Sequence, residues 1–192
     1  MSRNITVIIL FLAVATVTLP AQINATSNLG ECQTHALPPF IQNYLRQHSG
    51  RWRIQEPKDL GPRAHERWTA EKPLGCPGIV SGNLESTNEL SYAILLVPAT
   101  KGAKGYKLVV FNPDAAMHRY QATVVDQAEN SESAAFFIHA ISIGGFFDPQ
   151  SQKKFQVQAQ KGILFIDASE KEYEADVYFW GAGKYHSQPI DY

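Results

Sequence analysis

Residues 91–97 read Ser-Tyr-Ala-Ile-Leu-Leu-Val, a near-continuous apolar run that is the strongest structural signal in the chain. A run of this kind, without polar alternation, is typical of a strand that is buried on both faces. A segment containing Gly and Lys, 101–105, separates it from a second apolar run at 106–111. This spacing predicts that the two runs pair as an antiparallel hairpin at the centre of the fold.

Further segments extend the β pattern toward the C-terminus. They are 119–126, 135–143, 163–167, 175–180 and a short last strand at 184–185. Within 175–180 apolar side chains alternate with polar or aromatic ones, so we expect one apolar face and one amphipathic face.

Before the central strands the pattern is helical. Apolar side chains between 37 and 48 recur at spacings of three and four residues, which predicts a helix that ends near Gly50. Alternation over 51–55 predicts a short strand, whereas 56–75, rich in Pro, Gly and charged residues, is expected to be a loop with a helical turn at 64–68. Together the patterns predict an α+β fold, a single domain in which an N-terminal helix packs on a mostly antiparallel β-sheet.

Residues 1–25 have the composition of a secretory signal peptide. Arg3 precedes an apolar run at 5–19, and small residues follow it. The run is short for a membrane span, which needs about 20 residues, and no charged cluster follows it to support a retained anchor. We expect cleavage after Ala25, with Ala21 as the alternative. The mature domain, 26–192, is then exported to the periplasm or the extracellular space and has no membrane span.

The charge balance argues against one class of partner. The 192-residue chain has a formal net charge of −1, and removal of Arg3 with the signal peptide changes it to −2. Nucleic-acid binding needs many Lys and Arg side chains on one face. The nearest approach to a basic patch, Arg46, Arg51 and Arg53, is expected to be a solvated helix end and strand. No nucleic-acid partner is therefore expected.

The chain has two cysteines, Cys32 and Cys76. In an exported protein an even pair favours a disulfide, and their spacing does not match a metal site. A bridge across a loop of this length stabilises the folded state by about 4 kcal/mol in the chain-entropy model. We therefore expect a Cys32–Cys76 disulfide.

The segment 82–93, Gly-Asn-Leu-Glu-Ser-Thr-Asn-Glu-Leu-Ser-Tyr-Ala, has oxygen-bearing side chains at alternate positions. Alternating oxygens on a turning backbone are how a loop wraps a hard cation. The segment resembles the calcium-holding loop of the FG-GAP/VCBS family of secreted proteins, Gly-Asp-Phe-Asn-Gly-Asp-Gly-x-x-Asp-Tyr-Ala. The residues at its ligand positions are Asn83, Glu85, Thr87 and Ser91. The rest of the chain is similar to small uncharacterised exported bacterial proteins that carry one such loop.

The segment departs from that family pattern at residues that calcium binding requires. Carboxylates give a calcium site its affinity, and of the four ligand positions only Glu85 carries one. Ser86 and Asn88 also replace glycines that permit tight wrapping. We therefore expect a structural loop with no metal and no cofactor, and weak calcium binding is the alternative.

Aromatic side chains near the C-terminus are the candidates for ligand contacts. Phe146, Phe147, Tyr178, Trp180 and Tyr185 lie near turns or on the amphipathic face of a strand. Aromatic side chains with one wet edge are favoured at recognition surfaces. The competing interpretation is that they cap the sheet or meet the N-terminal helix.

No catalytic residue is assigned, because the histidines show neither metal-ligand nor catalytic spacing. The sequence thus favours a non-enzymatic binding module for another protein or a cell-envelope glycan. The alternative is a secreted or periplasmic hydrolase, since glycan hydrolysis uses a pair of acidic residues. Its acids would be Glu85 and those near the C-terminal hairpin, Asp167, Glu170, Glu172, Glu174 and Asp176.

Overall fold

The computed structural model describes residues 32, 34–48, 50–71, 75–85, 90–114, 116, 119–143, 161–169 and 173–191. The predicted signal peptide, 1–25, and the predicted contact residues Phe146 and Phe147 lie outside them. None of the helices in the described part of the chain has both the length and the apolar character that crossing a membrane requires.

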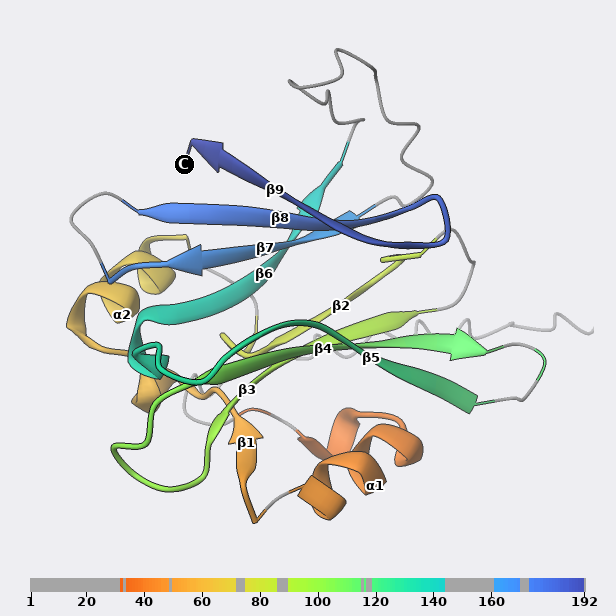
Figure 1. The fold of residues 1–192 in the computed structure, drawn as a ribbon, viewed down its shortest axis with the longest axis horizontal. Coiled ribbons are helices and arrows are strands. Elements are labelled where there is room, and N and C mark those ends of the chain that lie inside the picture. The colour runs from red at the N-terminus through yellow and green to blue at the C-terminus, as the bar shows by residue number, and fades with distance from the viewer. Residues whose placement is uncertain are drawn as a thin grey trace, which may run out of the picture.

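The described residues form two α-helices, three short 3-10 helices and nine β-strands (Figure 1). In chain order these are η1 (Thr34–Ala36), α1 (Pro39–His48), β1 (Trp52–Ile54), η2 (Pro57–Asp59), α2 (Pro62–Ala70), β2 (Ile79–Gly82), β3 (Ser91–Pro98), β4 (Tyr106–Asp114), β5 (Arg119–Ala128), η3 (Ser133–Ala135), β6 (Phe136–Ser142), β7 (Lys161–Asp167), β8 (Glu174–Gly181) and β9 (Lys184–Asp191). All pairings between these strands are antiparallel. The prediction of an α+β chain with antiparallel strands is confirmed, and strands dominate it.

The first sheet has the order β1–β3–β4–β5, and β2 also pairs with β3. The predicted hairpin of the two apolar runs is confirmed as β3 and β4, with Ile94 opposite Val109. The β4–β5 register shifts between Leu108 and Val109, so Val125 is an extra residue in a β-bulge of β5. This bulge bends the edge strand of the sheet.

The second sheet has the sequential order β6–β7–β8–β9. Its last strand, Lys184–Asp191, is longer than the predicted 184–185, because it pairs residue by residue with β8 from Gly181 back to Glu174. The chain thus forms two antiparallel sheets where the sequence predicted one.

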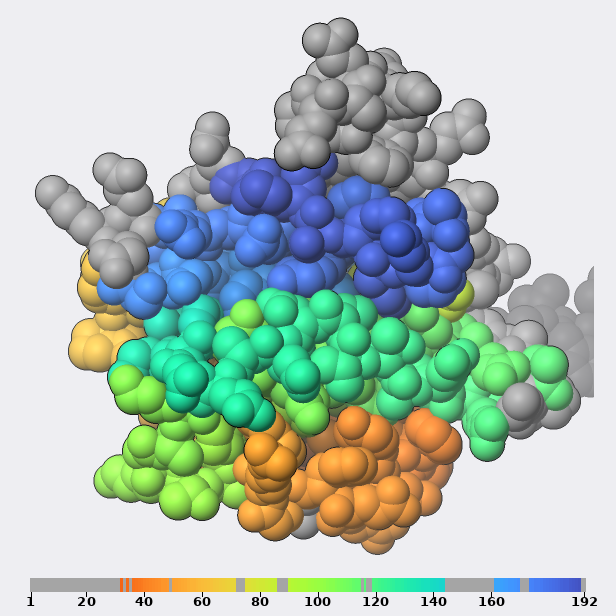
Figure 2. Space-filling model, in the orientation of Figure 1, coloured from red at the N-terminus to blue at the C-terminus, as the bar shows by residue number. Residues whose placement is uncertain are grey.

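The two sheets pack face to face around a shared apolar cluster. Its members are Val80, Leu84, Ala93, Leu95, Tyr106, Leu108 and Val110 from the first sheet and the loop after β2, and Phe136, Ile138, Ile163, Phe165 and Tyr178 from the second sheet. Figure 2 shows the blue surface of the C-terminal strands directly above the green and teal surface of β5.

The outer face of the first sheet is also buried. Ile94 and Leu96 of β3 belong to a second cluster that contains Phe111 and Ile41 of α1. Figure 1 shows α1 on the side of the first sheet away from the second sheet. Because β3 is buried on both faces, its sequence shows no polar alternation.

Helix α2 covers the outer face of the second sheet. Ala64 and Trp68 lie on one side of the helix and pack in a cluster with Phe137, Val177 and Phe179. The sequence predicted only a helical turn here. The helix is longer, 62–70, because Pro62 opens it at a position that proline favours and its apolar side meets a sheet.

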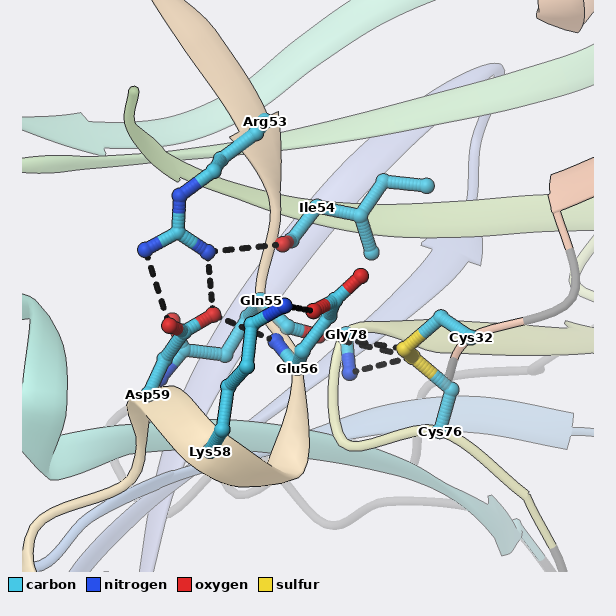
Figure 3. Close-up of a disulfide and its surroundings, with 9 residues drawn as sticks. All are labelled: Cys32, Arg53, Ile54, Gln55, Glu56, Lys58, Asp59, Cys76 and Gly78. Atoms are coloured by element: carbon cyan, nitrogen blue, oxygen red, sulfur yellow. Dashed lines mark hydrogen bonds and ion pairs between the residues drawn. A yellow bond between two sulfur atoms is a disulfide. The ribbon is translucent and has the colours of Figure 1, made fainter. Parts of the chain in front are cut away.

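The predicted disulfide between Cys32 and Cys76 is confirmed, with the two Cα atoms 5.2 Å apart. Figure 3 shows both sulfur atoms beside the backbone of Gln55, whose carbonyl oxygen lies 3.4 Å from each of them. The Gly78 N–H donates to the sulfur of Cys76. The Gln55 side chain donates to the carbonyl oxygen of Phe136 at 3.2 Å, so this region also joins the first sheet to the second.

Candidate functional site

A cleft of about 530 Å³ lies at the end of the sandwich that carries the β8–β9 turn. Its walls come from the loop after β2, the end of β4, the first half of β5 and the β8–β9 hairpin. The lining residues are Glu85, Asn112, Pro113, Asp114, Gln121, Thr123, Trp180, Gly183, Lys184 and Tyr185. This volume is within the range of small-molecule sites, about 300–1,000 Å³.

The β8–β9 turn builds the aromatic wall. Ala182 and Gly183 have φ angles of 49° and 81°, and two left-handed residues in succession are typical of a type I′ hairpin turn. The turn places Trp180 opposite Tyr185. Their rings meet edge to face, with centroids 5.0 Å apart. The hairpin therefore presents the two rings as one unit.

Packing holds this aromatic pair in place. Tyr185 is half-buried against the cluster between the sheets. Trp180, at the end of β8, is also half-buried and contacts the cluster beneath α2. Both rings are anchored at one end, and both line the cleft.

Asn112 fixes the Tyr185 hydroxyl. The tyrosine O–H donates to Oδ1 of Asn112 at 2.8 Å, and Asn112 is only 8% exposed. Burial is the main reason that the pKa of Tyr185 is raised, the Glu85 carboxylate adds to the rise, and the Asn112 bond opposes it. Tyr185 therefore remains a neutral donor with a fixed orientation.

Polar side chains from β4 and β5 form another part of the cleft lining. Gln121 pairs with Asn112 across the two strands, and Thr123 pairs with Val110 two residues along. Paired residues and their i+2 neighbours share a face of a sheet, so Asn112, Gln121 and Thr123 form a row of amide and hydroxyl groups. Both β5 side chains are exposed and available to a ligand.

Two carboxylates and one ammonium complete the cleft. Glu85 is half-buried, and burial raises the pKa of its carboxyl group. Asp114 accepts a hydrogen bond from the Ala116 N–H at 3.1 Å. Lys184 is exposed at the start of β9. The formal charge of the lining residues is therefore −1.

The segment 82–93, for which the sequence predicts an FG-GAP/VCBS-like loop, supplies Glu85 to this cleft. Leu84 is 1% exposed and anchors the loop in the core. The Asn83 carbonyl oxygen accepts the Lys161 N–H at 3.3 Å, and Ser91 is buried at the start of β3. Thr87 lies outside the described residues. Within the described part of the chain, no three His, Cys, Asp or Glu side chains form a group that could hold a metal ion.

The structure places Tyr178 apart from the cleft that Trp180 and Tyr185 line. It is 6% exposed, packs between the sheets and donates to Oδ2 of Asp126 at 2.7 Å. Tyr106 donates to the same oxygen at 2.7 Å. Tyr178 thus joins β8 to β5, whereas Trp180 and Tyr185 line the cleft.

Of the acidic residues proposed for hydrolysis, Glu85 lines the cleft, and the described ones near the C-terminal hairpin do not. Asp176 lies close enough to Asp126 for that carboxylate to help raise its pKa, after the larger effect of burial. Neither Asp176, Asp167 nor Glu174 lines the cleft, and Glu170 and Glu172 lie outside the described residues. Glu85 and Asp114 are the carboxylates that do.

Sequence reasoning missed the polar row. Asn112 lies within β4, and a polar residue directly after the apolar run 108–111 is the signal that could have marked it. Nothing in the sequence marks Gln121 and Thr123 as cleft residues. Their position beside Asn112 follows from the β4–β5 register, which cannot be read from the sequence.

The resemblance of segment 82–93 to the FG-GAP/VCBS loop stays a prediction. Comparison of the chain with protein-family models, with curated proteins and with solved structures finds no match.

Proposed function

We propose that this chain is an exported binding module that takes an oligosaccharide of the cell envelope in the cleft between the β8–β9 hairpin and β4–β5. One observation carries the proposal: the Trp180–Tyr185 pair and a row of amide and hydroxyl groups line a single cavity.

Sugar rings have the matching chemistry. One face of a pyranose is made of C–H groups, which gain dispersion energy against an aromatic ring. Its hydroxyls both donate and accept hydrogen bonds, as do the amides of Asn112 and Gln121 and the hydroxyl of Thr123. Because Tyr185 is already held by Asn112, less conformational freedom is lost on binding.

The shape of the site favours a glycan over a folded protein. A stable protein interface buries about 800 Å² on each partner, whereas this site is a concave cavity with polar groups on one wall. The Cys32–Cys76 disulfide supports export, because structural disulfides persist in oxidising compartments.

Trp180→Ala tests the proposal. Calorimetric titration of the mature, oxidised chain with neutral and charged oligosaccharides should show binding that Trp180→Ala weakens at least about tenfold, a typical loss for an aromatic anchor. Phe40→Ala is the matched control, since Phe40 is an exposed aromatic on α1 and does not line the cleft. If neither variant changes the affinity, or if no sugar binds, the proposal fails.

A hydrolase is the second candidate, because Glu85 and Asp114 line the same cavity. Glycoside hydrolysis uses two carboxyl groups, one as acid and one as base or nucleophile. Incubation of the bound oligosaccharides should then release shorter products, and Glu85→Gln or Asp114→Asn should each abolish that release. Intact ligands after long incubation with the unaltered chain would exclude the hydrolase for those ligands.

A further inference from the structure

Glu85 is a half-buried carboxylate that forms no ion pair with a cation in the described part of the chain. It follows the buried anchor Leu84. Burial raises the pKa of its carboxyl group, and no other described residue contributes to that rise. A cation in contact would lower the pKa of a carboxyl group, so the free protein leaves the cost of taking this charge out of water uncompensated.

Lys184 lines the same cleft as Glu85, but the two form no ion pair in the described part of the chain. Lys184 is exposed at the start of β9, and Arg119 is exposed opposite Asp114 in the β4–β5 register. The stem of Lys161 lies over Gly82, where a Cβ would meet it at 3.0 Å. None of these cations contributes to the pKa of Glu85.

We infer that the cleft selects sugars that carry a protonated amino group, with Glu85 as the residue that recognises the ammonium. This inference rests on the proposed sugar-binding function. Glu85 and Tyr185 line the same cavity, and the Glu85 carboxylate is close enough to help raise the pKa of the Tyr185 phenol. An amino group on a ring stacked at Trp180 and Tyr185 gains a charge-assisted hydrogen bond and a cation–π contact there.

The polar row argues for an amino sugar over a peptide lysine. A lysine side chain would use the carboxylate and the rings but has no hydroxyls for Asn112, Gln121 and Thr123. Acidic sugars are disfavoured, because they would bring a carboxylate beside Glu85 and Asp114.

The test compares ligands that differ in charge. The mature, oxidised chain is titrated at about pH 6, where amino groups are protonated, with a glucosamine trimer, its N-acetylated counterpart, a uronic acid trimer and trilysine. We expect the glucosamine trimer to bind about tenfold more tightly than the acetylated trimer, the gain of one hydrogen bond to a charged group. Glu85→Gln should remove that difference between the two trimers.

Glu66→Gln is the matched control, since Glu66 is an exposed carboxylate on α2. Near-ultraviolet circular dichroism of each variant checks that the aromatic packing is intact. The inference is overturned by equal binding of the amino and acetylated trimers, by a preference that survives Glu85→Gln, or by trilysine binding as tightly as the amino sugar. Sugar binding without amine preference overturns this inference alone, whereas the lack of binding by every sugar overturns the proposed function as well.

Discussion

Gly78 lies where the turn before β2 approaches the end of β1. A Cβ at this position would lie 2.5 Å from the Gln55 carbonyl oxygen and 2.9 Å from its nitrogen. Hydrogen bonds to Leu95 hold both Gln55 and Gly78 in place. The Gln55 N–H donates to the Leu95 carbonyl oxygen, and the Leu95 N–H donates to the Gly78 carbonyl oxygen. Gly78→Ala must therefore displace paired backbone, and we expect it to lower the free energy of unfolding by about 1–3 kcal/mol. Urea denaturation measures the loss.

Gly50→Ala is the control for that substitution. A Cβ at Gly50 meets nothing within 4 Å. The free energy of unfolding of the Gly50→Ala variant should therefore differ from that of the unaltered protein by less than about 0.5 kcal/mol. Equal losses at the two positions would show that the glycine-to-alanine change itself, and not the contact with Gln55, is responsible.

Asp176 carries a charge that the folded state disfavours. Burial, and then the Asp126 and Glu174 carboxylates, raise the pKa of Asp176 above its unfolded value. The folded protein therefore binds this proton more strongly, so stability falls as pH rises from the unfolded pKa through the folded one. Asp176→Asn removes the ionisation and should raise the Tm by about 1–3 °C near pH 7.

The pH dependence separates this effect from a packing change. The advantage of Asp176→Asn should shrink toward about pH 4, where the unaltered carboxyl group also becomes neutral in the folded state. Glu66→Gln, at an exposed site on α2, should show no such trend. An advantage that is constant with pH would mean that the Asp176 charge is not its cause.

At the scale of elements, the β8–β9 turn contains a residue poorly suited to its conformation. Ala182 has a φ of 49°, a left-handed conformation that costs a non-glycine residue about 1–2 kcal/mol. Ala182→Asn creates the Asn-Gly pair that type I′ turns prefer and should stabilise the protein by about 0.5–1 kcal/mol. Thermal melting checks the gain.

At the neighbouring position, Gly183, a substitution should change the stability in the opposite direction. Gly183 has a φ of 81° and an open space around its Cα, so Gly183→Ala should destabilise through the backbone alone. If Gly183→Ala stabilised the protein, this account of the turn would be wrong.

The 82–93 loop is expected to keep its turn without a metal ion. It gives the cleft a single described carboxylate, Glu85, while the Asn83 carbonyl oxygen already accepts a backbone bond. Millimolar calcium should therefore leave the Tm unchanged. A calcium-dependent rise of more than about 3 °C would contradict this expectation, since selective binding to the folded state stabilises it.

An element was predicted well where the residue pattern within its own segment defines it, and poorly where contacts with distant segments define it. The β3–β4 hairpin was evident because both strands are apolar and close in sequence. Helix α2 was underestimated, since only Ala64 and Trp68 of its nine residues are buried and the rest of its sequence looks like a charged loop. The length of β9 was missed because its outward residues are polar, and pairing with β8 defines it.

At the scale of the whole molecule, the division into two sheets could not be read from the sequence. Strand patterns show which faces are apolar but not which strands share a sheet. The sheets meet through an apolar cluster and through polar contacts between residues far apart in sequence, such as Tyr178 with Asp126 and Tyr185 with Asn112. The cleft depends on the same long-range arrangement. Trp180 and Tyr185 were predicted as contact residues from their own hairpin, whereas the polar row of Asn112, Gln121 and Thr123 was not predicted.

The disulfide links Cys32, which precedes α1, covalently to Cys76, in the turn before β2. Cys32 belongs to the apolar cluster on the outer face of the first sheet, and Cys76 packs against it in the turn before β2. The pair Cys32→Ser and Cys76→Ser opens a loop with a sequence separation of 44 residues, so the unfolded chain gains entropy. We expect the free energy of unfolding to fall by about 4 kcal/mol, measured by urea denaturation under oxidising conditions.

Reduction of the unaltered chain provides the control for this double variant. It breaks the same bond while both sulfur atoms stay beside the Gln55 carbonyl, so the two losses should agree if chain entropy is the cause. A much larger loss in the serine variant would instead assign the stabilisation to packing, because serine brings two hydroxyls into a buried cluster. An unchanged free energy of unfolding in both would show that the helix and sheet contacts alone hold α1 against β3.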